Sequence, residues 1–321
     1  MLSFPFHLPQ SFIEVIEEKI GKDPVVHKLA GDASVRQYFR LLPRSGAGSL
    51  IICVDPANSV QSFLEIHRLF KDNGIEVPDV FVSDPEIGLL LLEDLGDINL
   101  ETLVKDCLSN ETLAEYKKVI KLVLDIQSIR GVTLERSFDV QKLMSEFEFF
   151  IEHCLKGYFK ISDIPPDLKE GFEEIARAMY EPKLFVIAHR DYHSRNIIIK
   201  DNVARLIDFQ DAMMGLPQYD IVSLLEDPYS SLLPDVKERL KEDYRNTASQ
   251  RGIDTGDFER LYHIAAYQRN IKALGTYGYM ASVKNNSSFI PYIDISIRNI
   301  DSYALRLEET SRSWNIIKRL I

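Results

Sequence analysis

The chain has 321 residues, of which 45% are hydrophobic and 27% are charged, and its formal net charge is −11. This composition is typical of a soluble globular protein, and the length fits one large two-lobed domain or two ordinary domains. The acidic balance excludes non-specific binding to a nucleic-acid backbone, which requires a basic face. It leaves nucleotide binding open, because a metal ion can carry the compensating charge.

The chain is expected to stay in the cytoplasm and away from membranes. Its apolar runs are shorter than the roughly eighteen residues that a membrane helix needs, and its first twenty residues do not have the pattern of a secretory signal. Three widely spaced cysteines give neither a zinc-binding spacing nor a disulfide framework, so buried thiols are expected at Cys53, Cys107 and Cys154. The oligomeric state stays open.

The first hundred residues predict a small sheet. A first helix is expected at about residues 9–20, and one clear helix, capped by Ser59 and closed by Gly74, lies between the third and fourth strands. Segments rich in apolar and β-branched residues, mostly bounded by Gly, Pro or Asp, predict strands at 25–30, 36–42, 49–55, 79–84 and 88–94.

After Gly96 the pattern changes to long helices with one strand-like segment near residues 197–207. Helices are predicted at about 110–130, 140–156, 167–180, 219–226, 235–251, 257–280 and 292–309. We therefore predict an α+β fold of two lobes: an antiparallel-sheet lobe with one helix over residues 1–96, joined at about 92–97 to a mainly helical lobe over 97–321.

The segment HRDYHSRNIIIKDNVARLIDFQDA, residues 189–212, predicts a β-hairpin with polar residues at its ends. If the loop is the three residues 201–203, Asn196 faces Asp208 at about 5 Å between Cβ atoms, close enough for one cation to touch both. A two-residue loop would instead oppose Asp208 to Arg195 and would weaken the metal interpretation.

The chemistry expected of this segment is phosphoryl transfer. Amide and carboxylate oxygens from Asn196 and Asp208 suit Mg²⁺, with phosphates and waters completing its shell. Asp191 enters from the preceding loop as a separate carboxylate able to orient and deprotonate an attacking hydroxyl. Each residue alone fits a turn cap or a strand end; their combination with His189 and the D-x-x-x-x-N spacing favours the functional interpretation.

The motifs H189-R-D-Y-H-S-R-N196 and L206-I-D-F-Q-D211 resemble those of the aminoglycoside phosphotransferase family, which has a protein-kinase-like fold. Further segments most resemble one branch of it, the bacterial anomeric kinases that act on N-acetylmuramate and N-acetylglucosamine. These segments cover residues 30–40, 89–97, 219–229 and 268–275.

The resemblance implies a role for each residue of the central segment. Asp191 would be the catalytic base, while Asn196 and Asp208 would hold Mg²⁺. His189 would brace the catalytic loop, and Asp220 would support it from below, unless Asp220 is a plain helix N-cap.

The resemblance also implies ATP as cofactor. The loop 30–36 would cover the phosphates, and the connection near 92–96 would pair with adenine through its backbone. The implied nucleotide-binding residues are Gly31, Ser34, Arg36, Glu93 and Leu95. The alternative for the loop 30–36 is an ordinary hairpin turn, and the alternative for the connection near 92–96 is the ordinary end of a strand.

One departure from the family pattern concerns the third strand, where kinases carry a phosphate-binding lysine. Here the segment 49–56 reads SLIICVDP, with no lysine. The missing charge would come from Arg36 or Arg40, or the metal alone would suffice. Glu65 on the next helix would be the orphaned partner of that lysine, or simply an exposed helical residue.

The acceptor is expected beside Asp191. The implied acceptor residues are His193, Arg195, Gln210, Asp211 and Arg269. Positive charge from His193 and Arg195 would repel a polycationic aminoglycoside but not a neutral or carboxylate-bearing sugar.

The predicted function is an ATP- and Mg²⁺-dependent kinase. Its expected acceptor is the anomeric hydroxyl of N-acetylmuramate or N-acetylglucosamine, in cell-wall recycling. A kinase of the same fold for an aminoglycoside, choline-like or other hydroxyl acceptor stays open, as does a non-catalytic nucleotide-binding pseudokinase.

Overall fold

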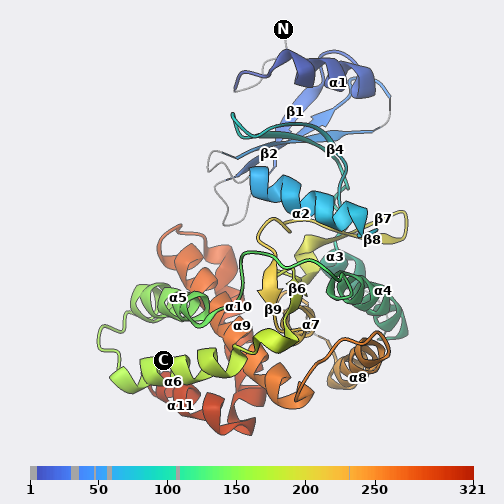
Figure 1. Cartoon of the computed structure of the whole chain (residues 1–321). Coiled ribbons are helices and arrows are strands. Elements are labelled where there is room, and N and C mark those ends of the chain that lie inside the picture. The colour runs from blue at the N-terminus through green and yellow to red at the C-terminus, as the bar shows by residue number, and fades with distance from the viewer. Residues whose placement is uncertain (1–5, 30–35, 47, 56–59, 106–108, 231) are drawn as a thin grey trace. The chain divides into compact units, whose positions relative to one another are not determined.

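The structure is a computed structural model that describes residues 6–29, 36–46, 48–55, 60–105, 109–230 and 232–321 (Figure 1). By its contacts the chain divides into two compact units. The first comprises Met1–Ile98 with Ile198–Asp211, and the second Asn99–Ile197 with Ala212–Ile321. This division differs from the predicted boundary near residue 96 because it returns the hairpin after Asn196 to the first unit.

The first unit is built on a five-stranded antiparallel sheet in the order β1-β2-β3-β5-β4. All five predicted strands are present, which confirms the sheet expected of this part. Their bounds are β1 Val25–Lys28, β2 Gln37–Leu42, β3 Leu50–Val54, β4 Val80–Asp84 and β5 Leu89–Glu93.

Two helices flank this sheet, and both were predicted, at about residues 9–20 and between the third and fourth strands, although the predicted lobe was described with one helix. Helix α1, Gln10–Ile20, covers one face of the sheet, and α2, Val60–Asp72, lies on the other (Figure 1). The apolar residues of α1 recur every four positions and form one core with the sheet, because that spacing places them on one side of a helix. This core includes Phe12, Ile16 and Ile20 of α1 with Phe39, Leu41, Ile52 and Leu91 of the strands. The expected cap Ser59 lies outside the described residues.

The hairpin consists of β7, Ile197–Lys200, and β8, Val203–Leu206, so its loop has two residues. Asp201 and Asn202 have φ of 52° and 62°, as a type I′ turn requires. Of the two loop lengths that the sequence left open, the structure has the shorter one, so the count that would place Asn196 opposite Asp208 does not hold and the metal interpretation loses that support. Tolerance of left-handed backbone by Asp and Asn is the physical reason for the tighter turn.

The second unit is mainly helical, as predicted. Its helices are α3 Leu100–Val104, α4 Ser109–Gln127, α5 Val140–Phe150, α6 Pro166–Met179, α7 Gln218–Leu225, α8 Pro234–Gln250, α9 Phe258–Ser282, α10 Ile290–Tyr303 and α11 Glu308–Leu320. A π-helical segment, Ile151–Tyr158, continues α5, and short 3₁₀ turns occur at Pro182–Leu184, Ser194–Asn196, Ser287–Phe289 and Ala304–Arg306.

Helix α9 is the buried axis of the second unit and packs against α5, α7, α10 and the π-helical segment. Gly278 makes the closest of these approaches possible. A Cβ at this position would lie 2.6 Å from the Cα of Cys154, so only glycine fits without a shift.

Three features of the second unit depart from the prediction. The helix expected at 292–309 is broken at Ala304–Arg306, and α11 follows it. Helix α3 was not predicted. A two-stranded antiparallel sheet of β6, Val186–Ala188, and β9, Met213–Gly215, was also missed, because three residues are too few to show a strand period.

Two of the three cysteines are buried thiols, as predicted. Cys53 and Cys154 are free and buried, whereas Cys107 lies outside the described residues. Among the helices that the structure describes, none is long and apolar enough to cross a membrane.

Candidate active site

The loop that carries Asp191 follows β6 and is anchored at its start by Asp220 of α7. The fully buried Asp220 carboxylate accepts the backbone N–H groups of His189 (2.6 Å) and Arg190 (3.0 Å). It bonds the loop rather than its own helix, so it is no plain helix N-cap. Burial raises the pKa of Asp220. Arg190 has a φ of 79°, a left-handed conformation that non-glycine residues rarely adopt away from functional sites.

The end of the same loop is anchored by Asp227, which the sequence analysis did not single out. Its buried carboxylate accepts the backbone N–H of Ser194 (2.9 Å), the Ser194 hydroxyl (2.6 Å) and the backbone N–H of Tyr229 (2.9 Å). Its position before proline in the quoted segment 219–229 was the signal available, because an aspartate there favours a turn. Between the anchors, the buried His189 ring lies edge-on to Tyr192.

Asp191 lies beside two cations of α9. Lys272 Nζ is 2.9 Å from Asp191 Oδ1, and the Arg269 guanidinium is 3.9 Å from the same oxygen. The Asp191 side chain is 30% exposed. Burial would raise the pKa of this carboxyl, but the charges of Lys272, Arg190 and Arg269 outweigh it and hold the pKa well below its usual range. Asp191 is therefore a carboxylate at any physiological pH.

A second carboxylate, Glu146 of α5, balances these cations. It accepts from Arg190 (3.0 Å) and from Gln268 (2.8 Å), and it is buried. The sequence analysis did not identify Lys272 or Glu146. The signal for Lys272 was its spacing of three residues from Arg269, which places both side chains on one face of a helix.

His193 and Arg195 do not leave an unbalanced positive charge beside Asp191. Burial lowers the pKa of His193 to about 3, with the charge of Arg269 as the next cause, so the ring is neutral at physiological pH. Arg195 bonds Glu101 at 2.7 Å and lies 3.7 Å above the Tyr229 ring, so a carboxylate neutralises its charge. The cations that lie beside Asp191 are Lys272 at 2.9 Å and Arg269 at 3.9 Å, and a part for His193 and Arg195 in binding the acceptor stays a prediction.

Asn196 is fixed by its amide nitrogen. Its Nδ2 donates to the backbone carbonyl of Asp191 (2.9 Å) and contacts Nε2 of His193 (3.3 Å). The amide oxygen is thereby left as the atom able to bind a cation, which is the donor that Mg²⁺ prefers.

Asp208 belongs to the first unit and is held by its neighbours in sequence. Its φ is 62°, and its side chain is 43% exposed. Oδ1 accepts from Gln210 (2.9 Å) and lies 3.5 Å from the Arg36 guanidinium. Gln210 also donates to Asp211 (3.2 Å), so these two residues, expected at the acceptor, lie beside Asp208.

Phe209 fixes the position of Asp208 by packing under α2. Its ring centroid lies 4.7 Å from that of Phe63 and 5.7 Å from that of Phe70. The apolar residue after the aspartate therefore buries itself against the helix, which leaves the carboxylate at the surface of the unit.

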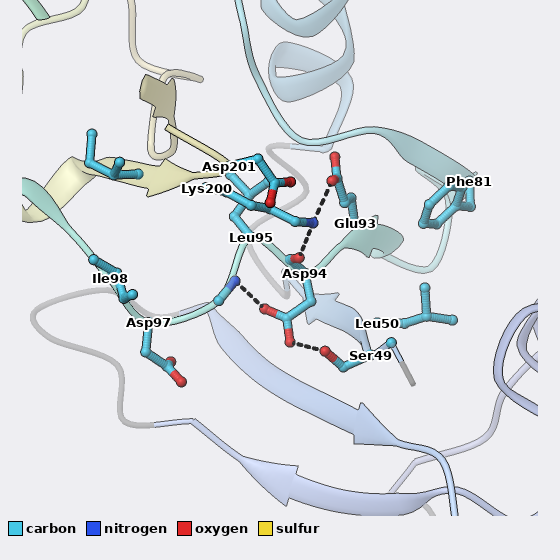
Figure 2. A pocket seen from close by; sticks show the side chains of 13 residues that line it. Ser49, Leu50, Phe81, Glu93, Asp94, Leu95, Asp97, Ile98, Lys200 and Asp201 are labelled. Atoms are coloured by element: carbon cyan, nitrogen blue, oxygen red, sulfur yellow. Dashed lines mark hydrogen bonds and ion pairs between the residues drawn. The ribbon is translucent and has the colours of Figure 1, made fainter. Parts of the chain in front are cut away.

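The connecting segment, residues 93–98, borders a cavity of about 500 Å³ within the first unit (Figure 2). Glu93 accepts from Lys200 (2.8 Å) and Arg205 (2.7 Å), so any part it plays in binding adenine falls to its backbone. Asp94 accepts from Ser49 (2.6 Å) and from the backbone N–H of residue 96 (2.9 Å), as Figure 2 shows. Leu95 also lines the cavity. The implied phosphate-loop residues Gly31 and Ser34 lie outside the described part of the chain.

The residues expected to hold a metal suit Mg²⁺ by their chemistry. The described residues contain no group of three or more His, Cys, Asp or Glu side chains placed to hold a metal ion. The amide oxygen of Asn196 and the carboxylate of Asp208 are each a kind of ligand that Mg²⁺ accepts.

A protein-family model matches most of this chain. The model of the family described as "Phosphotransferase enzyme family" matches residues 25–257. Curated relatives include the N-acetylmuramate/N-acetylglucosamine kinase of Pseudomonas aeruginosa, 24% identical over 98% of this chain and 93% of the relative. The protein of the same name from Pseudomonas putida is 28% identical over 77% of this chain and 74% of the relative.

Solved structures share the fold. Choline kinase LicA from Streptococcus pneumoniae superimposes with a TM-score of 0.63 at 17% identity, over 90% of this chain and 99% of that one. The ADP-bound aminoglycoside phosphotransferase APH(2'')-Ib has a TM-score of 0.57 at 15% identity, over 91% of this chain and 98% of that one. The predicted protein-kinase-like α+β fold is confirmed.

Proposed function

Because the chain belongs to the phosphotransferase enzyme family, we propose that it is an ATP- and Mg²⁺-dependent kinase acting on the anomeric hydroxyl of N-acetylmuramate or N-acetylglucosamine. The observation that carries the proposal is the anchored loop that presents Asp191 as a carboxylate beside Lys272. The names of the curated relatives support the acceptor. The proposed setting is cell-wall recycling in the cytoplasm.

Asp191 is the general base of the proposed reaction. Its carboxylate orients the acceptor hydroxyl and takes its proton as the oxygen–phosphorus bond forms and ADP departs. A low pKa makes it a weak base, which suits an anomeric hydroxyl because that group is more acidic than an ordinary alcohol. The transition state of phosphoryl transfer is loose, so positioning counts for more than basicity.

Lys272 and Asn196 position the base. The lysine holds one carboxylate oxygen at 2.9 Å, and the amide of Asn196 holds the backbone carbonyl of the same residue. Two contacts on one residue restrict its side chain and its main chain together, which favours a near-attack geometry.

Asn196 and Asp208 would hold Mg²⁺ through their oxygens. When bound, the ion neutralises charge on the phosphate oxygens of the nucleotide. Adenine would pair with the backbone of the connecting segment, to which Glu93 and Leu95 belong.

The cations around Asp191 also bear on the acceptor. Lys272 and the buried Arg269 would repel a polycationic aminoglycoside, whereas a neutral or carboxylate-bearing sugar would be accepted. Retention of Asp191, Asn196 and Asp208 argues against a pseudokinase. His193, Arg195, Gln210 and Asp211 stay candidates for acceptor binding.

The experiment that tests this function is ADP release over a panel of acceptors. We expect turnover with N-acetylmuramate or N-acetylglucosamine, and none with kanamycin or choline. Turnover confined to an aminoglycoside or choline would show that the proposed acceptor is wrong. Absence of turnover with every acceptor would favour the non-catalytic pseudokinase.

A further inference from the structure

The third strand of the sheet lacks the cation that a kinase uses there. β3 reads LIICV, and in the sheet Cys53 pairs with Tyr38 of β2. Protein kinases hold the nucleotide phosphates with a lysine on this strand, which pairs with a glutamate on the following helix. If this chain transfers phosphate, the positive charge has to come from another element.

Arg40 of β2 is one candidate, and its contacts exclude it. Its Nε lies 2.6 Å from Asp94 Oδ2, and its NH1 lies 2.8 Å from Asp97 Oδ2. Two carboxylates of the connecting segment, at 2.6 and 2.8 Å, therefore hold this guanidinium. Arg36 also has two carboxylate neighbours, but the second of them, Asp208, is 3.5 Å away and is the residue proposed to hold the metal of the nucleotide.

Arg36, just before β2, is the other candidate. Its Nε donates to Asp55 Oδ2 at 2.9 Å, and its NH1 lies 3.5 Å from Asp208 Oδ1. The Arg36 side chain is 14% exposed and that of Asp55 is 3% exposed, so the pair is shielded from water. Arg36 therefore lies beside the carboxylate to which the proposed function assigns the metal.

Asp55 is itself held rigidly at the end of β3. Its backbone N–H donates to the carbonyl of Gly88 (2.8 Å), and a Cβ on that glycine would lie 2.3 Å from the Asp55 carbonyl oxygen. Gly88 has a φ of 72°, which glycine adopts without strain. This close approach fixes the backbone of Asp55 and with it the direction of the carboxylate.

Glu65 of α2 does not take part in this arrangement. Its side chain is exposed, and its carboxylate accepts from Gln61 at 3.0 Å on the same helix. Glu65 is therefore not placed as the helix glutamate that pairs with the lysine in other kinases.

We propose that Arg36, oriented by Asp55, binds phosphate oxygens of the nucleotide beside Asp208, and that this pair replaces the lysine–glutamate pair of other kinases. The inference rests on the proposed function. A guanidinium has five N–H donors in a rigid fork, so it can keep its carboxylate partner while it binds phosphate oxygens. An arginine just before β2 would thus supply the charge that a lysine on β3 supplies elsewhere.

The test compares ligands with and without phosphates. Calorimetric titration of the full chain with ADP and with adenosine separates phosphate contacts from base contacts. For Arg36→Gln we expect at least about tenfold weaker ADP binding, the scale of a hydrogen bond to a charged group, and unchanged adenosine binding. Arg36→Lys should recover part of the ADP affinity, because it restores the charge without the fork.

Two further variants complete the design. Asp55→Asn should weaken ADP binding in the same selective way, because the guanidinium loses its orienting charge. The matched control is Arg44→Gln. Arg44 is an exposed arginine that donates to the backbone carbonyl of Asp23, so this variant should bind both ligands as the wild type does. Thermal unfolding of each variant separates misfolding from loss of affinity.

The outcomes distinguish this inference from the proposed function. Equal loss of ADP and adenosine in Arg36→Gln, or a selective loss of ADP in Arg40→Gln alone, would overturn it. Because the titration needs no acceptor, selective loss of ADP in a chain that turns over no sugar would sustain the inference while the proposed function failed. Conversely, if Arg36→Gln turned over the sugar with a wild-type KM for ATP, the proposed function would stand and the inference about Arg36 would fail.

Discussion

Lys272 donates to the carboxylate of Asp191 across 2.9 Å, from a helix 81 residues further along the chain. This contact links the loop that Asp220 and Asp227 anchor to the central helix α9. The side chain proposed as base is therefore positioned by the packing of the whole second unit rather than by its loop alone.

The first prediction concerns the base. Asp191→Asn should lower kcat by about 10²- to 10⁴-fold, because a general base contributes on that scale. The affinity for Mg²⁺–ADP should stay within about twofold, since Asp191 is not among the proposed metal ligands. Steady-state rates and calorimetry measure the two quantities. Near-native rates in this variant would show that another group takes the proton.

The second prediction concerns pH. The cations beside Asp191 depress its pKa, so the group is ionised and active far below neutral pH, and activity should fall only in acid. Lys272→Met removes the nearest of these cations. The pKa of Asp191 should then rise, and the acid limb of kcat/KM should move to higher pH.

The control for this shift is Lys156→Met, since Lys156 is exposed and pairs with Glu152 on its own helix. Its pH profile should match that of the wild type. An unshifted acid limb in Lys272→Met would mean that this lysine does not set the ionisation of the base.

The third prediction concerns the anchor of the loop. Asp220→Ala leaves two backbone N–H groups without a buried acceptor, which should cost about 2–4 kcal/mol of unfolding free energy. Chemical denaturation measures this loss. Asp163→Ala, at an exposed position, should change stability by less than about 0.5 kcal/mol. If Asp220→Ala also changed the free energy of unfolding by less than about 0.5 kcal/mol, other contacts would have to hold the loop.

The fourth prediction concerns the metal. Asp208→Ala and Asn196→Ala should each weaken the dependence of nucleotide binding on Mg²⁺, because each removes one oxygen donor. Titration of Mg²⁺ at fixed ADP should give an apparent affinity at least about tenfold weaker. ADP binding in EDTA should change much less in Asn196→Ala. An unchanged Mg²⁺ titration in both variants would remove these residues from the metal site.

How far the sequence predicts the fold depends on the length of each element. The strands of the first sheet are rich in apolar and β-branched residues, are mostly bounded by Gly, Pro or Asp, and were predicted, whereas β6 and β9 are too short to show such a pattern. The length of the turn at Asp201 stayed open between two and three residues, because the sequence does not reveal which residues adopt a positive φ.

The site shows the same division between local and distant information. Asp191 and Asp208 stand out because their neighbours form a motif. Lys272 and Asp227 do not, because their roles arise only when α9 and the segment after α7 pack against the loop. The missing lysine of β3 was evident in the sequence, but choosing between Arg36 and Arg40 required the contacts of Asp55 and of the connecting segment.

The measurement that tests the central claim most directly is phosphorus NMR of the product formed from ATP and N-acetylmuramate. The account predicts a phosphomonoester signal coupled to the anomeric proton, formed by the wild type and absent with Asp191→Asn. A phosphorus signal coupled to a proton of any other carbon, or the same product from Asp191→Asn at the wild-type rate, would contradict it.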